Sequence, residues 1–178
     1  MIIIIGASAS GKTVTALDLQ KRYGLVKAIT TTTREKRVGE TDGVEYFFIT
    51  KEEFQKRLNE GKFVESSLYN NNYYGCGVDQ VADNKIVVLD PNGLHAFNKL
   101  NNKNIVSFLL IADPKTREER MNIRGDKQEN IKMRLENDVI DFSLNKIGKV
   151  DFVIHTDNKT IQETADEIYD LYKKKINL

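Results

Sequence analysis

The chain has 178 residues, of which 30% are charged and 40% hydrophobic, and its formal net charge is +1. This length suits one domain with a substantial core, and the balanced charge gives no electrostatic case for a nucleic-acid or membrane partner. The single cysteine excludes an intrachain disulfide and a zinc site built from thiols. No apolar stretch approaches the roughly 18 residues that span a bilayer, and no secretory leader precedes the first strand-like run, so we expect a cytoplasmic protein.

The first predicted elements are a strand, a glycine-rich loop and a helix. The apolar run at residues 2–5 is followed by Gly6, Ala7, Ser8, Ala9, Ser10, Gly11, Lys12 and Thr13, which satisfy the pattern G-x-x-x-x-G-K-[ST]. Such a loop points backbone N–H groups at phosphate, its lysine reaches the β- and γ-phosphates, and its threonine hydroxyl binds Mg²⁺. A plain glycine- and serine-rich turn is the alternative, but the order of elements favours binding of a nucleoside triphosphate.

The segments up to residue 80 are short and polar. In chain order we expect a helix ending at Gly24, a strand over 25–31, a polar loop over 32–44, a strand over 46–49, a helix from 51 to 60, and strands over 63–66 and 72–74 around an asparagine-rich turn. Val14, Leu17 and Leu19 are the expected apolar face of the first helix, and Thr50 with Glu53 matches a capping box.

The second half of the chain alternates regularly between strands and helices. We expect strands over 86–90, 106–111 and 150–154, and helices marked by the apolar sets Leu94, Phe97 and Leu100; Ile131, Leu135, Val139 and Phe142; and Ile161, Ala165, Ile168 and Tyr172. This alternation predicts an α/β fold with a parallel sheet, and residues 32–80 form a small mixed lobe inserted into it.

Asp90 ends one of the apolar strands. P-loop proteins place a carboxylate that supports the Mg²⁺ shell at the end of such a strand, and we expect Asp90 to act in this way through water. Because Pro91, Asn92 and Gly93 follow, the alternative is an aspartate that caps a helix.

Two groups of arginines are candidates for phosphate binding. Arg34 and Arg37 are spaced to converge on one anion, with the Tyr46 phenol as a neutral donor, although a solvated charged loop would have the same composition. The other group comprises Arg120, Arg124 and Arg134, around the polar loop 125–129, from which cations could close over a γ-phosphate.

The alternative for the second group is surface pairing with the glutamates Glu118, Glu119 and Glu136. We expect such surface pairing for Arg117, which is therefore not a candidate site residue.

The ordered set of motifs resembles guanylate kinase from residue 2 to about residue 172. The resemblance rests on residues 6–13, Thr-Thr-Arg-x-x-Arg-x-Gly-Glu at 32–40, Gly-x-x-Tyr-x-Phe at 43–48, Phe-Val-Glu at 63–65, Asn-Tyr-Tyr-Gly at 72–75, Arg-Gly at 124–125 and Arg-Leu at 134–135. It implies the reaction ATP + GMP ⇌ ADP + GDP with Mg²⁺ on a P-loop core with a five-stranded parallel sheet flanked by helices. The implied parts are a core (1–31, 81–123 and 135–178), a small mixed α/β GMP-binding lobe (32–80) and a short lid (124–134).

The resemblance also implies the roles of single residues. Catalysis would fall to Lys12, Arg34, Arg37, Arg124 and Arg134, and ATP would be bound by residues 6–13 with Arg120 and Arg124. GMP would be bound by Thr30, Arg34, Arg37, Tyr46, Glu65, Tyr74, Cys76 and Asn92, and Mg²⁺ by Thr13 and Asp90. Chemistry supports Glu65 independently, because the N1–H and N2–H₂ edge of guanine is all donors and a carboxylate is acceptor-only.

Several positions depart from the family pattern. Cys76 stands where a hydroxyl usually serves guanine, Asn92 where an aspartate is common, Thr30 where serine is usual, and Thr156 where an asparagine is normal on the adenine side. The phosphate contacts are therefore intact and the base contacts softened.

Two other functions stay open at this point. One is a kinase for a phosphorylated sugar or another phosphate acceptor, against which Glu65 argues. The other is a protein-binding module without catalysis, against which the intact phosphate cradle and the arginines argue. The expected partners are GMP and ATP, without nucleic acid or membrane, and the chain would be a monomer or a homodimer.

Overall fold

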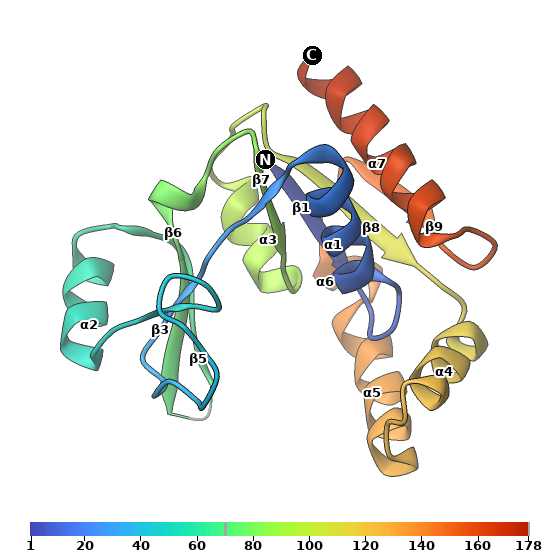
Figure 1. Cartoon of the computed structure of the whole chain (residues 1–178), viewed down its shortest axis with the longest axis horizontal. Coiled ribbons are helices and arrows are strands. Elements are labelled where there is room, and N and C mark those ends of the chain that lie inside the picture. Colours follow the sequence, from blue (N-terminus) through green and yellow to red (C-terminus); the bar gives the residue numbers. More distant parts are fainter. Residues whose placement is uncertain (70, 178) are drawn as a thin grey trace.

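Five parallel strands form the central sheet of the computed structural model, which describes residues 1–69 and 71–177 (Figure 1). In sheet order they are β2 (Val26–Lys27), β7 (Lys85–Val88), β1 (Ile2–Gly6), β8 (Val106–Ile111) and β9 (Phe152–His155). The helices connected to them are α1 (Lys12–Tyr23), α3 (Pro91–Asn98), α4 (Pro114–Ile123), α5 (Gln128–Asp141), α6 (Leu144–Ile147) and α7 (Ile161–Ile176). The predicted α/β fold with a five-stranded parallel sheet is confirmed.

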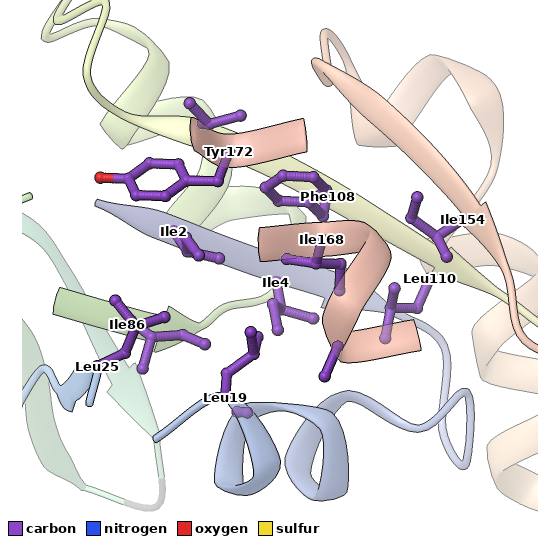
Figure 2. Close-up of a cluster of buried hydrophobic side chains, with 13 residues drawn as sticks. Ile2, Ile4, Leu19, Leu25, Ile86, Phe108, Leu110, Ile154, Ile168 and Tyr172 are labelled. Atoms are coloured by element: carbon purple, nitrogen blue, oxygen red, sulfur yellow. The ribbon is translucent and has the colours of Figure 1, made fainter. Parts of the chain in front are cut away.

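Strand β1 lies at the centre of this sheet and is buried on both faces. Ile2 and Ile4 pack in one apolar cluster with Leu19 of α1 and Ile168 of α7 (Figure 2). The alternate residues Ile3 and Ile5 belong to a second cluster, which contains Leu94 and Phe97 of α3 and Ile147 of α6. A continuous run of β-branched residues is what a strand covered by helices on both faces requires.

A second, mixed sheet lies beside the first, at the left of Figure 1, whereas α4 and α5 lie at the lower right. Its strands, in sheet order, are β4 (Phe47–Phe48), β3 (Thr31–Thr32), β6 (Asn72–Gly77) and β5 (Phe63–Tyr69). The β3–β4 pair is parallel and the other two are antiparallel. The expected asparagine-rich turn between β5 and β6 includes residue 70, which lies outside the described residues.

Helix α2 (Lys51–Asn59) covers the second sheet through one fully buried aromatic side chain. The Phe54 ring stacks on Phe63 and Tyr73, with centroid distances of 4.4 and 5.2 Å. The hydroxyl of Thr50 accepts the Glu53 N–H at 3.1 Å, which is half of the expected capping box, while the Glu53 carboxylate pairs with Arg57 instead. The short 3₁₀ turn η1 (Val78–Gln80) then leads toward the central sheet.

The single strand expected over residues 25–31 is wrong. The chain leaves the central sheet after Ala28, whose N–H still donates to the carbonyl of Ile86 at 2.8 Å. By Thr30, whose carbonyl accepts the Phe47 N–H, it has entered the second sheet. One apolar segment therefore serves two sheets, as β2 and β3, and a local pattern cannot reveal the crossing.

The predicted apolar faces of α1 and α5 are only partly buried. Leu19 of α1 is fully buried as predicted, but Val14 and Leu17 are 44% and 59% exposed, and α1 buries Thr15 and Ala16 in their place. In α5, Val139 is 71% exposed and the neighbouring Asp138 is buried. Leu100 and Ile161 are also exposed. The loop before α1 fixes which face of that helix meets the sheet, so small and polar residues displace the expected aliphatic ones.

Of the helices within the described ranges, none is long and apolar enough to cross a membrane.

Candidate active site

The loop between β1 and α1 curls tightly enough to present its main chain to an anion. Gly6, Ala9 and Gly11 have φ angles of +152°, +59° and +101°. A Cβ on Gly6 would lie 2.4 Å from the Leu110 carbonyl oxygen, so only glycine fits there. Gly11 is the N-cap of α1 and has no side chain to satisfy the first-turn N–H groups. Those donors and the helix dipole favour a phosphate at this position.

Lys12 folds back over the same loop. Its Nζ donates a hydrogen bond to the Ala7 carbonyl at 2.8 Å. Burial lowers the pKa of Lys12 to about 8, against an opposing contribution from the nearby Asp138 carboxylate. A bound phosphate would raise this pKa again, because an adjacent anion favours the ammonium.

A cleft of about 350 Å³ opens beside Lys12. Its lining residues are Ala9, Gly11, Lys12, Thr13, Val14, Thr15, Arg120, Arg124, Thr156, Lys159, Thr160, Ile161 and Thr164. The P-loop thus shares one cavity with Arg120, with the lid residue Arg124 and with the start of α7. This arrangement can hold the phosphates at one end and a base at the other.

Arg120 and Thr156 bind the P-loop through its carbonyl groups. Arg120 donates to the carbonyls of Ala9 and Thr156, at 3.2 and 2.7 Å, and to the Thr156 hydroxyl at 3.1 Å. The Thr156 hydroxyl in turn donates to the Ser10 carbonyl at 3.0 Å and is almost fully buried. The sequence marked Thr156 only as a departure from the family pattern, and the structure gives it a contact with the P-loop.

Asp126 contacts both lid arginines, Arg124 and Arg134. The Arg124 guanidinium makes a two-pronged contact with its carboxylate, with Nε 2.9 Å from Oδ1, and Arg134 Nη1 lies 3.6 Å from Oδ2. The hydrogen bond from Arg124 lowers the pKa of Asp126. The carboxylate that balances these cations thus comes from within the loop itself.

The other arginine group gathers around Glu40. Arg34 donates two hydrogen bonds to its carboxylate, at 3.0 and 2.7 Å, and the guanidinium carbon lies 5.6 Å from the Tyr46 ring centroid. Tyr46 packs edge-on against Tyr74 at 6.0 Å. Arg37 is exposed and joins this group through its main-chain N–H, which donates to Glu40 at 2.7 Å. Three of the four predicted GMP-phosphate ligands are therefore in mutual contact, and Arg37 is adjacent.

Glu65 and Cys76, the predicted base-reading residues, are cross-strand partners in the second sheet. Burial raises the pKa of Glu65 to about 7, and the nearby charge of Asp90 adds to this increase. Cys76 is fully buried within the apolar cluster that contains Ile3 and Ile5 of β1, and its Sγ lies 3.9 Å from the Gly77 carbonyl oxygen. A carboxyl group whose pKa is close to 7 can gain or lose its proton when a ligand binds.

Asp90 caps α3, which is the alternative that its sequence context left open. Its Oδ1 accepts the Gly93 N–H at 2.8 Å. Asp90 also lines a shallow hollow of about 400 Å³ with Ser67, Leu68 and Tyr74, on the side facing the second sheet. A role in supporting Mg²⁺ therefore remains a prediction.

Among the described residues, no side-chain contact fixes the role of two further predicted ligands at this side. Asn92 is exposed in the first turn of α3. Thr30 is half-buried and engages β4 through its carbonyl, so both assignments remain predictions.

Sequence reasoning missed one buried ion pair beneath the loop. The expectation that Arg117 lies on the surface is wrong, because Arg117 is only 6% exposed and its Nη1 lies 2.6 Å from Oδ2 of Asp138. Asp138 also accepts the Ser8 N–H at 3.0 Å. Arg117 is three residues before Arg120, on the same face of α4, which was the one available signal; nothing marked Asp138.

The residues present fit magnesium bound together with phosphates. Within residues 1–69 and 71–177, no group of three or more histidine, cysteine, aspartate or glutamate side chains could hold a metal ion. Mg²⁺ at phosphate-transfer sites needs no such group, because it takes most of its oxygens from substrate and water. Thr13, at the start of α1 and on the cleft wall, offers the single hydroxyl that such a site requires.

Comparison with known proteins gives a consistent result. The family described as guanylate kinase matches residues 1–175. The chain is 32% identical to the guanylate kinase of Chlorobaculum tepidum, over 94% of this chain and 91% of that protein. It is 29% identical to the guanylate kinase of Anaplasma phagocytophilum, over 97% and 85% of the two chains. The crystal structure of guanylate kinase from Anaplasma phagocytophilum superimposes with a TM-score of 0.66 at 26% identity, covering 97% of this chain and 85% of that one.

Proposed function

The chain belongs to the guanylate kinase family, and we propose that its P-loop cleft and its two arginine groups form one active site for phosphoryl transfer. The protein is a nucleoside monophosphate kinase that uses ATP to phosphorylate GMP, and we extend this to dGMP. The observation that carries the site assignment is the shared cleft, in which the P-loop, Lys12, Arg120 and Arg124 face one cavity.

The donor side binds ATP through the P-loop. Main-chain N–H groups at the start of α1 would cradle the β-phosphate, and Lys12 would move from the Ala7 carbonyl onto the β- and γ-phosphates. Arg120 already contacts the loop, and Arg124 would exchange Asp126 for phosphate oxygens. This side therefore supplies positive charge where the transition state accumulates negative charge.

The acceptor side binds GMP on the second sheet. Arg34, Arg37, Tyr46 and Tyr74 would hold the GMP phosphate, with the Glu65 carboxylate accepting from the guanine N1–H and N2–H₂ groups. A phosphate oxygen of GMP then attacks the γ-phosphorus of ATP. The new P–O bond forms as the bond from the γ-phosphorus to the β–γ bridging oxygen breaks, and ADP leaves.

We propose Thr13 and, through water, Asp90 as the protein groups that hold Mg²⁺. When bound, the ion neutralises charge between the β- and γ-phosphates. The Thr13 hydroxyl would bind it directly, and the Asp90 oxygen not engaged at Gly93 would receive a hydrogen bond from its water shell.

The division into a core, a GMP-binding lobe (32–80) and a lid (124–134) is also a proposal. The second sheet and the α4–α5 pair lie on opposite sides of the central sheet in Figure 1, so arginines from both must converge on one reaction centre. We propose that both parts close on the bound nucleotides and exclude water from the transfer. We further propose a cytoplasmic enzyme that acts as a monomer or a homodimer, without nucleic-acid or membrane partners.

An assay of ADP release against several acceptors tests this function. GMP and dGMP should support turnover, whereas AMP, IMP and ribose bisphosphate should support much less. Turnover with ribose bisphosphate would favour a sugar-phosphate kinase, and no turnover with any acceptor would favour a binding module. The Lys12→Ala variant should lose on the order of 100-fold or more in kcat while remaining folded, because a charge facing the transferred group is removed.

A further inference from the structure

The buried ion pair between Arg117 and Asp138 contacts the P-loop and is not part of the hydrophobic core. Both side chains are at least nine-tenths buried, and each contacts Ser8. The Asp138 carboxylate accepts the Ser8 N–H at 3.0 Å and lies 3.3 Å from the Ser8 hydroxyl. Arg117 Nη1 lies 3.3 Å from the Ser8 carbonyl oxygen and 2.6 Å from Asp138. No other part of the proposed mechanism uses this pair.

These contacts fix the orientation of one peptide group. The peptide between Ala7 and Ser8 is planar and trans, so its N–H and its C=O point in opposite directions. Asp138 holds the N–H side, and the C=O side accepts Lys12 Nζ at 2.8 Å and the Ser10 N–H at 3.2 Å. Rotation of this peptide would take the acceptor away from Lys12 and open the loop.

The pair also joins the loop to both helices that carry predicted phosphate-binding arginines. Arg117 lies one turn before Arg120 on α4, and Asp138 lies one turn after Arg134 on α5. Residues three or four apart share a helix face, so each anchor is on the same side as one of these arginines. Separating a buried pair is costly, because it leaves an uncompensated charge.

We propose that Asp138, held by Arg117, is a positioning residue that sets the Ala7–Ser8 peptide and through it the catalytic lysine. This inference rests on the proposed function for its kinetic readout. The acceptor oxygen for the Ser8 N–H is the essential element, and the ionic charge of the pair is not.

Two double variants separate these roles. R117L/D138N and R117L/D138L both remove the ion pair without leaving an unpaired charge, and they differ in whether residue 138 can accept the Ser8 N–H. We expect R117L/D138N to keep a kcat close to wild type. We expect R117L/D138L to lose about 10- to 100-fold in kcat, because the reacting groups are misplaced, with an unchanged KM for GMP.

Three further measurements make the result decisive. Thermal unfolding should give both double variants similar Tm values, so that a loss confined to kcat is not a loss of folding. The Ser8 amide should exchange with solvent faster in R117L/D138L than in R117L/D138N, a readout that does not depend on turnover. Glu136→Gln, an exposed change on the same helix, should leave kcat unaltered.

Equal kcat values and equal Ser8 exchange in the two double variants would overturn the inference. If R117L/D138L does not fold, R117L/D138A replaces it with the same expectation. Absence of GMP-dependent turnover in the wild type would instead refute the proposed function, and amide exchange would still test the peptide anchor.

Discussion

Glu65 and Cys76 are direct partners across the β5–β6 ladder, next to the register irregularity between Phe63 and Glu65. Opposed residues in an antiparallel pair project from the same face of the sheet. Burial, followed by the Glu65 carboxylate, raises the pKa of the Cys76 thiol to about 12. A titratable acceptor thus lies beside a neutral, weak donor, and this pairing leads to the first three predictions.

GMP affinity should fall as the pH drops below about 7, where Glu65 takes up a proton and can no longer accept two hydrogen bonds. The limiting slope is about tenfold per pH unit for one required deprotonation. Calorimetric titration of GMP over this pH range measures it. The GMP phosphate also titrates, with a second pKa of about 6, so Glu65→Gln serves as the control. Identical pH profiles in wild type and variant would contradict the assignment of Glu65 to guanine.

The same substitution should stabilise the free protein at alkaline pH. The folded pKa of Glu65 is raised above its ordinary value of 4.5, so its favourable contribution is present below pH 4.5 and is lost as the pH rises to about 7. Above pH 7 the wild type keeps a buried carboxylate, which the neutral amide of the variant replaces. The Tm of Glu65→Gln should therefore exceed that of wild type at about pH 8, and the difference should shrink at about pH 5. A difference that does not depend on pH would contradict this account.

Cys76→Ser should increase GMP affinity about two- to tenfold, since one hydrogen bond contributes a net 0.5–1.5 kcal/mol. The hydroxyl is a better donor to guanine O6 than the thiol. Because Cys76 packs among apolar side chains, the free protein should also lose some stability. Calorimetry with GMP and with AMP makes the comparison, and AMP affinity should change little. A weaker GMP affinity in the serine variant would mean that residue 76 does not face the base.

Asp126→Asn should lower the KM for ATP about two- to fivefold, the range expected for releasing an exposed ion pair. Arg124 and Arg134 both contact the Asp126 carboxylate, so an ATP phosphate must compete with it. Steady-state kinetics with varied ATP measure the change, and the KM for GMP is the internal control. A higher KM for ATP would mean that Asp126 positions the arginines for phosphate.

Gly6→Ala should destabilise the protein severely and abolish ATP binding. The new Cβ would lie 2.4 Å from the Leu110 carbonyl oxygen and 2.6 Å from the Ser10 hydroxyl, at a φ of +152°. Gly24→Ala is a matched control, since it has a φ of +67° but nothing within 4 Å of the new Cβ. Gly24→Ala should lower the free energy of unfolding by only about 1 kcal/mol, because alanine is strained in the left-handed region. Equal urea midpoints for the two variants would show that the contact at Gly6 is relieved without cost.

Local signals in the sequence were sufficient to locate the P-loop and to predict the parallel α/β fold. The loop is eight consecutive residues whose glycines satisfy backbone requirements on the spot, and strands and helices alternate with apolar periods that neighbouring residues determine. The resemblance to guanylate kinase implied a base-reading role for Glu65, and the donor edge of guanine supported a carboxylate there. The split of residues 25–31 between two sheets was not visible, because it depends on which distant strand each half meets.

Tertiary structure alone decided which polar side chains support the loop. Asp138 is 130 residues from Ser8, and Thr156 is 146 residues from Ser10, so no local pattern links them. The apolar periodicity of α5 favoured Val139 as the inward residue, yet α5 buries Asp138, where Arg117 and the Ser8 N–H compensate its charge. A buried carboxylate is stable only where folding brings such partners to it, and their positions are set by the packing of whole elements.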